Sequence, residues 1–379
     1  MISDYKQFRA FFASQDMPEN AFDVSRDDET TNLHAVSMES ITALSQWTEN
    51  SYDRKNRKLK IIPGYIESMT PNAVADSDGS NFYIGINNAL FVIIHEFSMF
   101  CFAQQNFFPN IGDANNEVSP EPLDGRAPGL WLLNHTTKGE RVSDLHSKHL
   151  IPRCSERYVA SIYLAQIMLR YVWLHELAHC CNGHIGYIRD NKIASRVHEL
   201  ETGLSAAQLS NNKASHNLEQ MQLLEYDADS VALAGSVRIQ NNGLENIEGI
   251  RNLGKNQAID LTIFGAFAMA WLFEEIQAYL NVRKNVSHPA PYLRLHNLVR
   301  TANKYLESEL ADIRDRSQSA YEKFDSIKGV IPKIYSGQKI AADLESNDFQ
   351  LQFLKIDQEM TALRDKLKIY RFGPKPIET

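Results

Sequence analysis

The stretch that most constrains the fold is HELAHCCNGH, residues 175–184, which sets two histidines four positions apart. On an α-helix, side chains four positions apart leave the same face about 5–6 Å from each other. The apolar residues Leu164, Met168 and Val172 recur at helical spacing and lead into this face. The chain therefore has to place a helix, from about 155 to 182, so that both imidazoles point toward the interior.

His175 and His179 at this spacing can hold one zinc ion through two imidazole nitrogens. A catalytic zinc site usually takes three protein ligands and leaves a fourth position for water. A third ligand is therefore expected elsewhere in the chain.

The segment LLEYDADSVALAG, residues 223–235, contains two acids one helical turn apart, Glu225 and Asp229. They lie at the edge of an apolar face, and no lysine or arginine occurs between Lys213 and Arg238 to neutralise them. We expect Glu225 to be the third ligand. Asp229 is expected to accept the ring N–H of a ligating histidine, most simply His175. Three other acids are weaker candidates for the third ligand: Glu199, Glu201 and Glu219.

Glu176 follows the first histidine by one position, so it points away from the metal axis. From there it can take a proton from a water molecule activated by zinc and return it to the leaving amine. The predicted chemistry is hydrolysis of a carbonyl compound.

Three further residues are candidates near this site. His288, in SHPAPYLRL at 287–295, lies at an expected helix entrance; it would stabilise the oxyanion or approach zinc, or lie on the surface as a loop histidine. Six positions later, Arg294 would clamp the substrate or form a structural ion pair. His184 follows an expected helix end at Asn182–Gly183 and would line the pocket or lie on the surface.

The pattern along the chain predicts a mainly α fold with a small β-sheet, an α+β class. An apolar helix is expected at 87–105, with His95 as a core residue, and two strands or a hairpin at 58–68 and 80–86. From Ser155 onward, helices are expected near 155–182, 216–236, 256–282, 289–309, 310–328 and 343–370.

Composition and charge narrow the classes of function. Apolar residues make up 43% of the 379 residues and charged residues 23%, as in ordinary soluble globular proteins. The net charge of -8 argues against sequence-independent nucleic-acid binding. The apolar run 261–273 is shorter than the roughly 20 residues that span a bilayer, so a core helix is expected there. The N-terminus lacks the pattern of a secretory signal, and the four cysteines are too few for a disulfide framework, so we expect a cytoplasmic protein without membrane spans.

The HExxH motif, the ExxxD motif and the His288-Pro289 segment, in this order, resemble the gluzincin zinc peptidases, in particular the HtpX-type group. A closer resemblance is to the Lit-type phage-exclusion peptidases, in which a histidine follows the motif as His184 does here. This similarity covers roughly residues 80–305.

The resemblance implies a soluble, gluzincin-like core with Zn²⁺. It also implies a bacterial protease that cuts a host protein, with a translation elongation factor as precedent, and so stops growth during phage infection. Such an enzyme would stay latent until a trigger, for example a phage-derived activator, releases it. In HtpX-type enzymes the strand before the zinc helix lines the substrate groove, so residues 81–86, with Tyr83, are expected to form a peptide-binding edge.

Three regions are expected: residues 1–60 of unknown role, a zinc metallopeptidase core at 61–310, and a helical extension at 311–379. Two other functions remain open. The chain would be a non-catalytic regulatory or binding protein stabilised by zinc, or a zinc hydrolase acting on a small amide.

Overall fold

The computed structural model describes residues 2–14, 20–21, 29–54, 57–122, 128–136, 138, 140, 150–193, 197–198, 212–242, 253–279, 291–330 and 347–374. This part of the chain is mainly helical and contains two small sheets, which confirms the expected α+β class.

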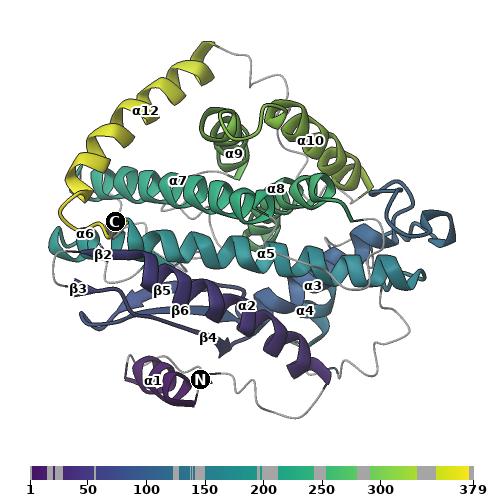
Figure 1. The fold of residues 1–379 in the computed structure, drawn as a ribbon, viewed down its shortest axis with the longest axis horizontal. Helices are drawn as coiled ribbons and strands as arrows, with labels where there is room; N and C mark the ends of the chain where they lie inside the picture. Colours follow the sequence, from purple (N-terminus) through teal and green to yellow (C-terminus); the bar gives the residue numbers. More distant parts are fainter. Residues whose placement is uncertain are drawn as a thin grey trace.

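The helices form layers on one face of the larger sheet (Figure 1). The long helix α5 (Ser155–Cys181) runs through the middle, between the sheet and the pair α7 (Asn212–Asn241) and α8 (Lys255–Tyr279). The opposite face of the sheet is covered by α1 (Ile2–Ala13). Beyond α7 and α8 lie α9 (Pro291–Leu306), α10 (Ile313–Val330) and α12 (Asn347–Leu367).

The larger sheet has five strands in the order β1-β4-β6-β5-β7. Their bounds are Asn20–Ala21, Ile61–Glu67, Phe82–Asn87, Ala73–Ser77 and Val197–His198, respectively. The strands expected at 58–68 and 80–86 are present as β4 and β6, but the expected hairpin is wrong because these two run parallel. The antiparallel partner of β6 is β5, a strand that the sequence did not predict. Its Asp76 is buried and paired with Arg189.

The second sheet joins distant parts of the chain in the order β3-β2-β8. Its strands are β2 (Tyr52–Arg54), β3 (Arg57–Lys58) and β8 (Gly373–Pro374). Because β8 pairs with β2, the end of the described C-terminal segment is held against the N-terminal region.

The expected apolar helices lie inside the fold. The helix at 87–105 is α3 (Asn88–Ala103), and its His95 is 7% exposed, with a pKa lowered to about 3 by burial and by the nearby His34. Within α8, the stretch Lys255–Phe273 is long and apolar enough to cross a membrane, yet it is 83% buried in the fold, as a core helix is. The remaining helices are α2 (Glu29–Ser51), η1 (Ala114–Asn116), α4 (Leu130–Thr136) and α6 (His184–Asp190).

One hydrophobic core draws on all three expected regions. It contains Ile41 from the N-terminal region, Met168 from α5, and Leu367 and Phe372 from the C-terminal segment. The segment 347–374, within the expected helical extension, therefore packs against the same core as the rest of the described chain.

A buried arginine on α5 holds the loop that follows α3. The side chain of Arg157 is 0% exposed and lies 3.7 Å from the carboxylate of Glu117. Its guanidinium donates to five backbone carbonyls, those of Phe102, Gln104, Phe107, Phe108 and Ile111. Arginine suits this position because its five N–H donors have a fixed planar geometry.

We expect Arg157→Met to lower the free energy of unfolding by about 3 kcal/mol, because it takes the guanidinium donor from five carbonyls and the positive charge from the buried Glu117 carboxylate. Urea unfolding measures the change. The control is Arg238→Met, which removes an ion pair to Glu309 between half-exposed side chains and is expected to cost less than about 1 kcal/mol. Equal losses in the two variants would contradict this role of Arg157.

Candidate metal centre

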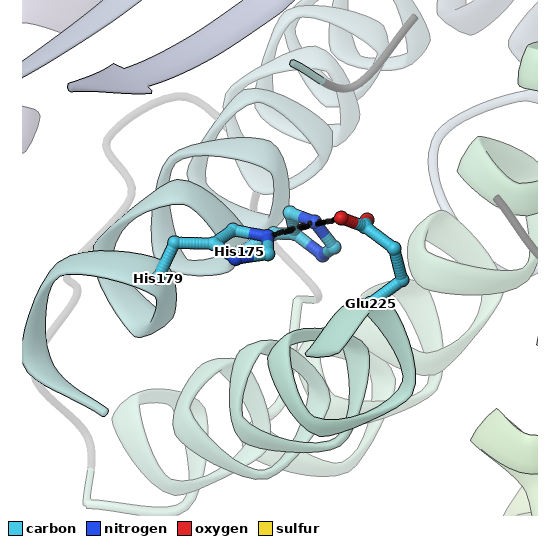
Figure 2. Close-up of side chains that lie close together, drawn as sticks. All are labelled: His175, His179 and Glu225. Atoms are coloured by element: carbon cyan, nitrogen blue, oxygen red, sulfur yellow. Dashed lines mark hydrogen bonds and ion pairs between the residues drawn. The ribbon is translucent and has the colours of Figure 1, made fainter. Parts of the chain in front are cut away.

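Three buried side chains from two helices meet between α5 and α7 (Figure 2). The Nε2 atoms of His175 and His179 lie 3.0 Å apart. Glu225 places one carboxylate oxygen 3.2 Å from Nε2 of His175 and the other 3.6 Å from Nε2 of His179. The structure therefore brings together the three residues predicted as metal ligands, and this group can bind a metal ion.

Asp229 holds the other ring nitrogen of His175, as the spacing predicted. Its Oδ1 lies 3.0 Å from Nδ1 of His175 and also accepts from the Tyr171 hydroxyl at 3.0 Å. Arg294 binds both carboxylate oxygens, with distances of 2.9 and 2.8 Å. Burial opposes ionisation of Asp229, but the charge of Arg294 and the hydrogen bond from His175 lower its pKa well below the usual value.

A second carboxylate supports His179 through another histidine. Nδ1 of His179 lies 2.9 Å from Nδ1 of His184, and Nε2 of His184 lies 3.2 Å from Oδ2 of Asp227. Asp227 also accepts from Asn182 at 2.7 Å and from Nε of Arg364 at 2.8 Å. Burial opposes ionisation of Asp227, and His184 and Arg364 lower its pKa well below the usual value.

These partners determine which ring nitrogens carry protons. Nδ1 of His175 faces the carboxylate of Asp229 and donates to it, which leaves Nε2, itself next to the Glu225 carboxylate, as the nitrogen available to a metal ion. For the same reason His184 is protonated on Nε2; its Nδ1 then accepts from Nδ1 of His179. The Nε2 atoms of both predicted ligands are directed at each other and at Glu225.

This arrangement fits a bound cation. Two nitrogen lone pairs and a carboxylate within 3.6 Å repel one another unless positive charge lies among them. A proton on one nitrogen relieves part of the repulsion, whereas a divalent cation satisfies all three donors. Two imidazole nitrogens and one carboxylate are ligands that zinc takes in catalytic sites.

The two other residues predicted around the motif are present but buried. Glu176 lies on α5 next to the first ligand and is 0% exposed. His184 is also 0% exposed, and its contacts are with His179 and Asp227, so it supports a ligand and lines no open pocket.

Two expected substrate contacts are not found. Arg294 is 2% exposed and its guanidinium holds Asp229, so the structural ion pair is the correct alternative. Strand β6 lies inside the sheet between β4 and β5, so residues 81–86 form no open edge. Tyr83 faces α1, where its ring stacks on Phe11 and its hydroxyl donates to Asp78. Alternation along β6 turns it away from α5.

His288 lies outside the described residues, so its predicted role stays a prediction. The alternative ligands Glu199 and Glu201 also lie outside them, whereas Glu219 is exposed on α7 and is not in the ligand group.

Two charged residues of the site were missed in the sequence, Asp227 and Arg364. Asp227 stands in the same lysine- and arginine-free stretch as the two acids that were recognised, so the same argument applied to it. Arg364 is 137 positions away from Asp227, and nothing in its own neighbourhood indicates the contact.

Comparisons of the chain with protein-family models, with curated proteins and with solved structures gave no match.

Proposed function

We propose that the chain is a zinc-dependent endopeptidase that is latent until triggered. The observation that carries the proposal is the convergence of the Nε2 atoms of His175 and His179 with the Glu225 carboxylate, beside Glu176. Within the described residues the group has three members, and three protein ligands are typical of catalytic zinc sites, which keep one position for water or substrate.

Zinc in this site would supply a Lewis acid for hydrolysis of a carbonyl compound. The residues of the chain would do the rest. Glu176 takes a proton from the attacking water and gives it to the leaving amine. Asp229, held by Arg294, keeps His175 in the tautomer that presents Nε2 to the metal. We assign His288 to the developing oxyanion, on the basis of its sequence alone.

Latency is supported by the burial of the site. The three ligands and Glu176 are between 0 and 2% exposed, so a peptide cannot reach the ligand atoms without a rearrangement. A protease of the cytoplasm needs such control, because it would otherwise cleave proteins of its own cell. The resemblance to Lit-type peptidases supports a host protein as substrate, a translation elongation factor being the precedent, and a phage-derived activator as the trigger.

The test uses the purified full chain loaded with zinc. It is incubated with extracts of uninfected and phage-infected bacteria, and new protein termini are mapped by mass spectrometry. We expect new termini in the infected extract, absent when a chelator has removed zinc. If neither extract gives new protein termini, the endopeptidase proposal fails; release of a small amine or acid instead would indicate a small-amide hydrolase.

The alternative is a non-catalytic protein that keeps zinc for stability, as a regulatory or binding module. The burial of the ligands favours it, because no substrate reaches the ligand atoms in this conformation. It predicts unfolding on chelation and no effect of Glu176→Gln on the biological activity.

A further inference from the structure

Helix α12 reaches the metal centre through one side chain. Arg364, in its last turn, binds Oδ1 of Asp227 through Nε at 2.8 Å and through Nη2 at 2.6 Å. Asp227 lies on α7 and its side chain is 3% exposed, whereas that of Arg364 is 37% exposed. The contact thus joins a buried carboxylate to a helix on the outside of the molecule (Figure 1).

From Asp227 the hydrogen bonds continue in one direction to a metal ligand. His184 donates from Nε2 to Asp227 and accepts at Nδ1 from His179. A carboxylate placed behind a ligating histidine in this way orients the ring and raises its basicity. Here the carboxylate acts through a second imidazole, and Arg364 supplies a positive charge to that carboxylate.

The same C-terminal segment also packs on the turn that carries His184. Gly183 has φ +86°, and a Cβ added there would lie 2.5 Å from Cβ of Tyr370. Two residues later, the backbone N–H of Phe372 donates to the carbonyl of Cys181 at 2.8 Å. The segment after α12 therefore holds the turn between α5 and α6, while Arg364 holds the carboxylate to which that turn binds.

We propose that Arg364 is a positioning residue for the metal centre. It acts through Asp227 and His184 on His179, so that metal affinity depends on how α12 packs against the rest of the fold. The inference rests on the metal site of the proposed function. This effect requires no open path from solvent to the ligands, because α12 lies on the outer face of the molecule and its packing can change there.

The test compares two arginines that hold α12. Arg364→Gln removes the contact to Asp227, and Arg300→Gln removes the ion pair between α9 and Asp357 of α12, at 2.6 Å. Both variants weaken the attachment of α12, but only the first breaks the connection to His179. The dissociation constant of Zn²⁺ is measured on the full chain by competition with a chromophoric chelator, and Co²⁺ absorption reports the ligand geometry.

We expect Arg364→Gln to weaken zinc binding by about 10- to 100-fold, the range found when carboxylates behind metal ligands are lost. Arg300→Gln should stay within about twofold of wild type. Arg364→Lys keeps the charge and lessens any risk of misfolding, and should give an intermediate affinity, because lysine has no planar fork for the carboxylate. Circular dichroism and the unfolding temperature show whether each variant is folded.

Equal zinc affinity in wild type, Arg364→Gln and Arg364→Lys would overturn this proposal and leave the proposed function intact. Equal weakening by Arg364→Gln and Arg300→Gln would also overturn it, because the effect would then follow from loosening α12 in general. A wild-type chain that binds no zinc would remove the proposed function together with this inference.

Discussion

Glutamine in place of Glu176 is expected to reduce peptide hydrolysis by a factor on the order of 10³ while zinc stays bound. The amide has nearly the size and shape of the carboxylate, so the packing around this 0% exposed side chain is kept. It cannot accept and return a proton, and the transfer to and from water is lost. The rate is measured with the triggered enzyme, and zinc content by elemental analysis of the same sample.

The matched control is Glu156→Gln, the same substitution in the first turn of α5. It lies twenty positions from Glu176, about 30 Å along the helix, and should leave the rate unchanged. If Glu176→Gln hydrolyses peptide as fast as wild type with its zinc in place, Glu176 is not the general base and another group takes the proton from water.

The ligand group was predictable because its determinants are local. His175 and His179 are set by a four-residue spacing on one helix, and Glu225 and Asp229 by the same spacing on another. The remaining step was to expect the two helices side by side. It rested on charge, because buried acids with no lysine or arginine near them in the sequence need a cation from elsewhere. The structure brings His175 and Glu225 together across 50 residues of sequence, as that argument predicted.

The supports behind the ligands were harder to predict, since their partners are distant in the chain. Asp227 is two positions from Glu225 and points about 200° away around α7, toward His184 and Arg364. Spacing assigns it to the other face of the helix but cannot say what covers that face. The sequence likewise left the role of Arg294 open, because the local pattern around a basic residue on a helix is the same whether its side chain binds substrate or a buried carboxylate.

Contacts with distant segments also limited the prediction of the strands. Alternation in β6 separates Tyr83 from Phe82 and Ile84, but it does not tell which face carries α5. Strand β5 escaped prediction because its buried Asp76 resembles a turn residue until Arg189, 113 positions later, is placed beside it.

Replacing the third ligand is expected to abolish the stabilisation of the fold by zinc. In wild type without zinc, the Glu225 carboxylate lies 3.2 Å from Nε2 of His175, and the Nε2 atoms of the two histidines lie 3.0 Å apart, so these donors repel one another unless a proton lies among them. Zinc removes this repulsion and, at a thousandfold excess over its dissociation constant, adds about 4 kcal/mol to the free energy of unfolding. Glu225→Gln takes away the charge and offers an N–H donor to the imidazole, which should stabilise the metal-free protein by about 1 kcal/mol.

Zinc-loaded wild type should therefore have the highest free energy of unfolding of the four states, and metal-free wild type the lowest. Glu225→Gln should lie between them, with nearly equal values with and without zinc. Urea unfolding with added zinc or with a chelator measures all four. Glu219→Gln is the matched control, since Glu219 is exposed on the same helix outside the ligand group and should respond to zinc as wild type does. A Glu225→Gln chain that zinc stabilises as much as wild type would show that Glu225 does not hold the metal. Metal-free wild type as stable as metal-free Glu225→Gln would instead show that a proton already occupies the place between the three donors.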